Sequence, residues 1–440
     1  MKLRVRRIAG ILAGHSALCL LLLNACGPKP PARTALYGNL DQLKRDIQSA
    51  QQAGKLNHHA VVDLAQAVAE RELASAQGEN GALRIRSLRS CARPLRSAIE
   101  RRARAADAVA AESTLILLEL HAADESALLH RYARAESGAW RAVAARAARR
   151  SIDSDLRRAF FVDPDERVRR AAFASARSVR EAAELEALLE AARVDPDPQS
   201  QSLAIVAAGA IGGERAVLAL KDLWAKADDP SRIAIVDAWT EPASFAAGGA
   251  RELGLAAESG GGLAAVSASY ALSRAGGADS AVANARLRRD MLDGSDDEKR
   301  LALRVAPIDP ETETALVKAS KDASPELRVV ALTRLLGVDA RRSDALRALR
   351  EIANAKASSD SERHAQGAAL NALAQAGDTS VSVALVKDLR DPALEIRSRA
   401  ARSLTSLGDY TNAATALADD DGNLRSEVAC LVLARETAPR

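Results

Sequence analysis

Apolar side chains recur along this chain every three or four positions, the spacing that places them on one face of an α-helix. The clearest segment is 391–409, DPALEIRSRAARSLTSLGD, where arginines fall between the apolar positions. Asp391 can cap the first free N–H groups, Pro392 suits the first helical position, and Gly408 suits the helix end. The stripe consists of Leu394, Ile396, Ala400, Ala401, Leu404 and Leu407. One such helix cannot bury its stripe alone, so the pattern predicts a stack of similar helices.

Three marks of helix starts and ends recur with the same rhythm. Asp-Pro, Ser-Pro or Asp-Ser start signals stand at residues 163, 195, 229, 324, 360 and 391. Arginines follow at Arg169, Arg232, Arg300, Arg328, Arg363, Arg397 and Arg425, and helix-ending glycines at Gly212, Gly276, Gly337, Gly377 and Gly408. The shared period of roughly 30 to 36 residues corresponds to one helix pair per repeat.

The first part of the chain has helical spacing with less regular ends. Helical patterns cover residues 36–53, 60–77, 83–104 and 105–120, and Pro94 is expected to break the third. We therefore expect an N-terminal helical region over 36–124 and a repeat solenoid over 125–440. The predicted fold class is all-α, an α-solenoid of antiparallel helix pairs.

The repeated motif resembles a known family. The motif consists of Asp-Pro, then Val-Arg or Ile-Arg, then paired alanines and Leu-Gly-Asp, as in segments 163–172 and 391–409. It resembles HEAT repeats of the bacterial type also found in phycobilin-lyase-like proteins. The resemblance covers about 125–436 and implies a right-handed superhelix. It also implies a hydrogen-bonded ladder between the Asp and Arg residues of successive repeats, here Asp163, Arg169, Arg328, Arg363, Asp391, Arg397 and Arg425.

The segment 246–262, AAGGARELGLAAESGGG, departs from this pattern because it has six glycines and a weak apolar stripe. We expect a loop or a degenerate helix at a bend of the superhelix, with a binding loop as the alternative.

The N-terminus has the features of an export signal. Basic residues precede an apolar run over residues 8–23, which is short for a membrane-spanning helix. Leu23-Asn24-Ala25-Cys26 resembles the lipobox of bacterial lipoproteins. That resemblance implies a signal peptide over 1–25, a diacylglyceryl group on Cys26, and a proline-rich extended tether over 26–35. The alternative is an ordinary signal with an incidental cysteine.

The net charge of the 440-residue chain comes from this signal. The whole chain has 62 Lys and Arg against 58 Asp and Glu, and four of the basic residues lie in the first seven positions. Without the signal the charges balance, which removes most of the case for nucleic acid as a partner.

Two cysteines, Cys91 and Cys430, remain beyond the lipobox. In an elongated solenoid they would lie near opposite ends, whereas a disulfide needs Cα atoms within about 7 Å. We therefore expect no disulfide and two buried or half-buried thiols.

No catalytic or metal-binding motif is present in the sequence. H-E-x-x-H, C-x-x-C, G-x-S-x-G and phosphate-binding glycine loops are all missing. Adjacent His58 and His59 would point about 100° apart on a helix and have no third ligand. HEAT-like hydroxylases that use iron carry His-Glu pairs, and this chain has none. We expect no enzyme activity, no cofactor and no metal.

The sharpest charged feature is segment 84–104, with eight arginines against one glutamate. Its first part is a candidate docking face made of Arg84, Arg86, Arg89, Arg93 and Arg96. A solvated helix face or contact with anionic lipid headgroups is the alternative.

The sequence as a whole favours a non-enzymatic scaffold. We expect a lipid-anchored monomer that binds another envelope protein, and Gly27 after the lipidated cysteine favours the periplasmic face of an outer membrane. The alternatives are a lyase-like accessory protein that acts as a chaperone for a client, and a purely structural envelope protein.

Overall fold

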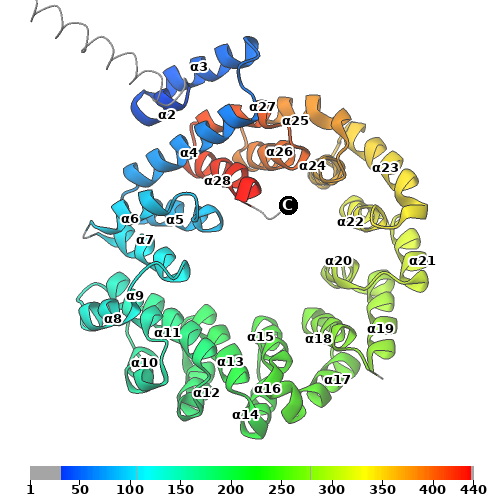
Figure 1. Cartoon of the computed structure of the whole chain (residues 1–440). Coiled ribbons are helices and arrows are strands. Elements are labelled where there is room, and N and C mark those ends of the chain that lie inside the picture. Colours follow the sequence, from blue (N-terminus) through cyan, green and yellow to red (C-terminus); the bar gives the residue numbers. More distant parts are fainter. Residues whose placement is uncertain (1–30, 106, 278, 438–440) are drawn as a thin grey trace, which may run out of the picture. The chain divides into compact units, whose positions relative to one another are not determined.

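The computed structural model describes residues 31–105, 107–277 and 279–437, and in these residues every regular element is a helix (Figure 1). The all-α prediction is confirmed, and the helices stack as a solenoid. The chain divides into two compact units. Of the described residues, unit 1 comprises 31–98 and 382–437, and unit 2 comprises those between 99 and 381.

Unit 2 is a two-layer array in which helices alternate between the layers. Successive helices of one layer pack side by side: α9 (Gly138–Ala147), α11 (Glu166–Val179), α13 (Pro198–Ile211), α15 (Asp229–Thr240), α18 (Gly262–Ala275), α20 (Asp296–Val305), α22 (Pro325–Leu335) and α24 (Asp360–Gln375). The other layer contains α8 (Glu125–Tyr132), α10 (Ser154–Phe160), α12 (Leu185–Val194), α14 (Gly213–Trp224), α17 (Ala250–Ser259), α19 (Asp279–Asp293), α21 (Pro310–Ala319) and α23 (Asp339–Asn354). Helix α7 (Ala108–Glu119) packs against α9 at the start of the array.

Alanine is the main reason that these layers lie close together. Between α9 and α15 the buried core includes Ala144, Ala172, Ala208 and Ala238, all fully buried. At Gly209 an added Cβ would lie 2.5 Å from atoms of Ala238, so α13 and α15 approach each other more closely than any side chain permits. Trp140 and Trp239 are buried, and Trp224 packs beside the core.

Unit 1 joins the two ends of the chain. Its N-terminal part has α2 (Ala32–Tyr37), α3 (Leu40–Gln52), α4 (His58–Ser75), α5 (Gly78–Ser87) and η1 (Arg89–Cys91). Its C-terminal part has α25 (Ser382–Asp388), α26 (Leu394–Leu407), α27 (Tyr410–Ala413), η6 (Ala414–Ala418) and α28 (Gly422–Thr437). Helix α28 packs between α26 and α4, so the N-terminal helices take the place of the next repeat after α28. The chain passes from one unit to the other at residues 98–99 and 381–382, whereas the sequence pattern places a boundary at residue 125.

Two expectations about single segments are corrected here. Helix α26 begins at Leu394, two residues after Pro392, because the Asp391 carboxylate accepts the N–H of Ala393 and holds a turn before the helix. Its end is as predicted, since Gly408 is left-handed with φ 81°. The extended tether over 26–35 is wrong for its last four residues, because α2 starts at Ala32 and buries Ala32 and Ala35 in unit 1, where α2 packs on α4.

The glycine-rich segment 246–262 is helical rather than a loop. A π-helical turn (η4, Phe245–Gly249) leads into α17 and is kinked at Gly248, where φ is 114°. Gly260 and Gly261 break the run again before α18. Leu253, Ala256 and Ala257 are buried at helical spacing, which is why the helix forms despite the glycines. The degenerate-helix alternative is the one that the structure shows.

Candidate functional site

Arginines of the repeats pair with aspartates of the next repeat. In unit 2, Arg169 donates to both carboxylate oxygens of Asp195 at 2.8 and 2.9 Å and to the carbonyl of Asp163. Arg141 pairs in the same way with Asp163 at 2.8 Å. Burial alone would raise the pKa of Asp163, but the hydrogen bonds from Arg141 and from a backbone N–H hold it below its ordinary value.

Unit 1 repeats this arrangement. Arg397 donates to the Asp419 carboxylate at 2.8 Å and to the carbonyls of Asp391 and Pro392. Arg425 donates to the carbonyl of Asp419. Arg397 thus ties its own helix start to the following repeat, and Arg425 makes the same contact with the carbonyl before its own helix.

Two of the expected ladder residues lie differently. Arg363 pairs with Asp360, one turn away in its own helix, and Arg328 donates at 3.4 Å to the carbonyl of Asp322. Among the described residues, neither pairs with an aspartate of the following repeat. The aspartate partners Asp195 and Asp419 were not among the expected ladder residues, although Asp195 carries the same Asp-Pro signal as Asp163.

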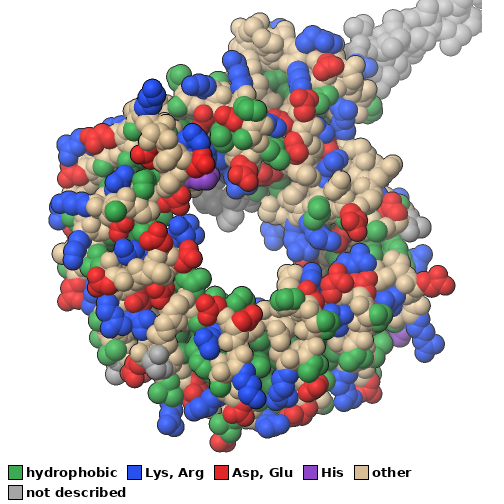
Figure 2. Space-filling view, turned by 180° about the vertical axis from the view of Figure 1, so that it is seen from behind, with side chains coloured by type: hydrophobic (Ala, Val, Ile, Leu, Met, Phe, Trp, Pro, Cys, Tyr) green, Lys and Arg blue, Asp and Glu red, His purple; other side chains and the backbone are tan. Residues whose placement is uncertain are grey.

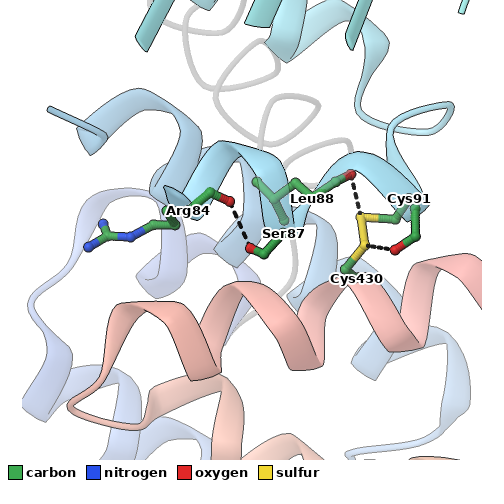
Figure 3. Close-up of a disulfide and its surroundings, with 6 residues drawn as sticks. Arg84, Ser87, Leu88, Cys91 and Cys430 are labelled. Carbon is green, nitrogen blue, oxygen red and sulfur yellow. Dashed lines mark hydrogen bonds between the residues drawn. A yellow bond between two sulfur atoms is a disulfide. The ribbon is translucent and has the colours of Figure 1, made fainter. Parts of the chain in front are cut away.

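The expectation of two free thiols is wrong. Cys91 in η1 and Cys430 in α28 form a disulfide inside unit 1, with Cα atoms 5.2 Å apart and a sequence separation of 339 positions (Figure 3). The Ser90 hydroxyl lies 3.1 Å from the Cys430 sulfur. The distance argument failed because it assumed separated ends, whereas α28 packs on α4, α5 and η1.

The candidate docking face lies on α5, η1, the turn that follows η1 and the start of α6 (Arg96–Ala103). Arg86, Arg89, Arg93 and Arg96 are exposed, whereas Arg84 is half-buried and bound to Glu72 at 2.8 Å. Leu88 and Leu95 separate these arginines and point into the core. On the face that Figure 2 shows, basic and acidic side chains are interspersed.

The structure shows no assembled metal-binding cluster among the residues that it describes. His58 contacts Glu436 at 2.6 Å and the Tyr410 ring, and His364 lies 4.0 Å from Glu326. Within residues 31–437, apart from the two undescribed positions, none of the helices has the length and apolar character needed to cross a membrane. Cys26 and the signal lie outside the described residues.

A groove with a partly apolar lining lies between α17 and α19. It has a volume of about 690 Å³ and is floored by Leu272 of α18. Leu255 and Val282 face it with 43 % and 61 % of their surface exposed. At Gly254 an added Cβ would meet no atom within 4 Å, so the missing side chain widens the groove.

Arg286 fixes the two walls of this groove. It donates to the carbonyl of Ala257 in the last turn of α17 at 2.6 Å and to the carbonyl of Gly260 just after that helix at 3.2 Å. It also pairs with Asp290 at 2.8 Å. Burial raises the pKa of Asp290, although Arg286 and Arg289 oppose this. The groove rim carries Arg251, Glu258, Asp279 and Arg289, so it offers both charge signs around an apolar centre.

The fold and this groove define a class, a helical-repeat protein with a preformed surface groove. Comparison with protein-family models finds no match, and comparison with curated proteins finds none either. Among solved structures, the chain is similar to human deoxyhypusine hydroxylase in complex with glycerol, with 18 % identity and a TM-score of 0.25. The similarity covers 65 % of this chain and 96 % of that chain.

Proposed function

We propose that this protein is a non-enzymatic scaffold, anchored by lipid on Cys26, that binds another protein of the bacterial cell envelope. The observation that carries the proposal is the groove between α17 and α19, where exposed Leu255 and Val282 lie beside charged side chains of both signs. Protein interfaces combine an apolar centre with a polar rim in this way.

Two further features support the proposal. Disulfides persist in oxidising compartments, and the Cys91–Cys430 bond therefore suits an exported protein. The same bond occupies both thiols, which removes the reactive side chain that a lyase-like accessory function would use. A lipid on Cys26 would hold the protein at the membrane, since each buried CH₂ is worth roughly 0.8 kcal/mol.

The test is site-specific crosslinking in intact membranes. A photoreactive residue replaces Val282 in the groove, and in a matched control it replaces Leu218 of α14, which is 51 % exposed and outside the groove. We expect one stoichiometric protein partner from position 282 and none from position 218. The same partner should be lost when Gly254→Leu fills the groove, since a Cβ added at Gly254 meets no atom within 4 Å.

Equal labelling from both positions, or no product above background at position 282, would overturn the groove as the binding site. Neutralising the arginines of segment 84–96 in the same assay tests the other candidate docking face. A partner lost only in that variant would move the interface to unit 1.

A further inference from the structure

A second hollow lies at the start of unit 2, where α7, α8 and α9 meet the end of α6. Its volume is about 470 Å³, within the range that holds a large side chain or a small ligand. Leu117 of α7, Leu128 of α8 and Trp140 of α9 supply apolar walls. This pocket shares no residue with the α17–α19 groove.

The aromatic wall is held rigidly. Tyr132 stacks on Trp140 with ring centroids 4.3 Å apart and planes inclined by 20°. The Arg131 guanidinium lies 5.1 Å from the centre of the Tyr132 ring. A preorganised aromatic surface loses little conformational entropy when it binds an apolar group.

The charge of the pocket has one sign. Arg104 and Arg131 line it, and no acidic residue does. Within the described residues, neither guanidinium has an ion pair or side-chain hydrogen bond with a carboxylate.

Acidic side chains on the neighbouring helices are already engaged. Asp107 pairs with Arg102 at 2.7 Å, Asp124 caps α8, and Glu125 pairs with Arg149 at 3.1 Å. Two cations beside an apolar cavity are therefore left without a counter-ion from these helices. A ligand with carboxylates would supply it.

We propose that this pocket receives an acidic peptide segment of the partner, with one large apolar side chain in the cavity and flanking carboxylates on Arg104 and Arg131. The proposal rests on the protein-binding function above and names the partner's chemistry. The apolar side chain of the peptide would pack against Leu117, Leu128 and the Tyr132 ring. The two guanidiniums would favour a peptide with carboxylates over one in which uncharged amides replace the carboxylates.

The test uses full-length protein in detergent micelles and fluorescein-labelled peptides, with binding measured by anisotropy at low salt. The peptides place Phe, Leu, Trp or Tyr between pairs of Glu, and each has a counterpart with Gln in place of Glu. We expect the best acidic peptide to bind about tenfold or more tightly than its Gln counterpart, as for charge-assisted hydrogen bonds.

The variants Arg104→Glu and Arg131→Glu should each weaken the acidic peptide by about tenfold or more. The matched control is Arg134→Glu, an exposed arginine just after α8 that does not line the pocket, and it should change binding by less than about threefold. Arg104 lies beyond the end of α6, so Arg104→Glu should leave the thermal unfolding midpoint unchanged. Weaker peptide binding by this variant would therefore report lost binding and not lost folding.

Equal binding of Glu and Gln peptides, or an equal effect of all three variants, would overturn the proposal.

The two proposals also fail separately. A partner crosslinked at position 282 and still bound by both pocket variants would refute the pocket alone. Peptide binding with the expected variant pattern, but no crosslinked partner, would refute the envelope scaffold alone.

Discussion

Arg425 of α28 forms an ion pair with Glu72 of α4 at 2.6 Å, across 353 residues of sequence. Glu72 gives Arg425 the carboxylate that Asp419 gives Arg397 in the preceding repeat. It also binds Arg84 at 2.8 Å, and its side chain is only 1 % exposed. The N-terminal helix α4 therefore serves the last repeat of unit 1 as the next member of the stack.

We expect Glu72→Gln to destabilise unit 1 by about 2 to 4 kcal/mol, because two partly buried guanidiniums lose their shared carboxylate. Hydrogen–deuterium exchange should show faster exchange in α4 and α28. Asp63→Asn, at an exposed position of the same helix, is the control and should leave exchange unchanged. Slow exchange in α28 of the Glu72 variant would contradict this role.

The disulfide should also stabilise unit 1. Closing a loop of this length restricts the unfolded chain, so Cys430→Ser should lower the free energy of unfolding by about 3 to 5 kcal/mol. Urea unfolding measures the change, and reduction of the native-sequence protein should reproduce it. Peptide mapping without reduction should find the Cys91 and Cys430 peptides joined. Recovery of both as free thiols from the exported protein would refute the bond.

Local sequence predicted the helices because the signals of a helix are local. The spacing of Leu394, Leu404 and Leu407 and the glycine at Gly408 describe α26 within a single segment. The junction of the two chain ends has no such signal. Glu72, Cys91 and Cys430 each lie in an ordinary helical pattern, and only the packing of α28 on α4 brings them together.

The groove was partly visible in the sequence. Segment 246–262 was singled out by its glycines, and Gly254 does open the hollow beside Leu255. Its second wall, with Val282, comes from α19, whose place follows from tertiary packing. The buried triplet Leu253, Ala256 and Ala257 has helical spacing and could have favoured a helix over a loop.

Acid should weaken unit 2 through Asp163. Its pKa is lower in the folded protein than in the unfolded chain, so its contribution to stability is present above about pH 5 and is lost as the pH falls through the folded pKa. Asp163→Asn should cost about 2 kcal/mol at pH 7 and progressively less below pH 4. Urea unfolding of the variant and of the native-sequence protein at pH 7 and below pH 4 tests this. A cost that does not change with pH would show that the charge is unimportant.

Cys26→Ser should release the folded protein from membranes, because the lipid chains would supply the affinity. Fractionation of cells that express each form measures the change, and circular dichroism should find equal helix content. Cys19→Ser, within the predicted signal, is the matched control and should leave the protein bound. A Cys26 variant that stays fully in the membrane fraction would refute the lipid anchor.

Arg157 of α10 and Glu184 of η3 (Ala182–Glu184) form an ion pair at 2.6 Å in which both side chains are fully buried. Arg157 also donates to the carbonyls of Ala148 and Arg150, so it fixes the turn before α10. Glu184→Gln would leave a buried cation without a counter-ion and should destabilise unit 2 by about 3 to 5 kcal/mol.

The matched control for this pair is Glu190→Gln, at an exposed position of α12, which should cost less than about 0.5 kcal/mol. Replacing both partners, Arg157→Met with Glu184→Leu, removes both charges from the interior. The double variant should therefore regain most of the stability that Glu184→Gln loses, because no unpaired charge stays buried. Urea unfolding of the three variants decides the matter. A double variant as unstable as the single one would show that the hydrogen bonds from Arg157 to the carbonyls, rather than the charge pairing, hold this turn.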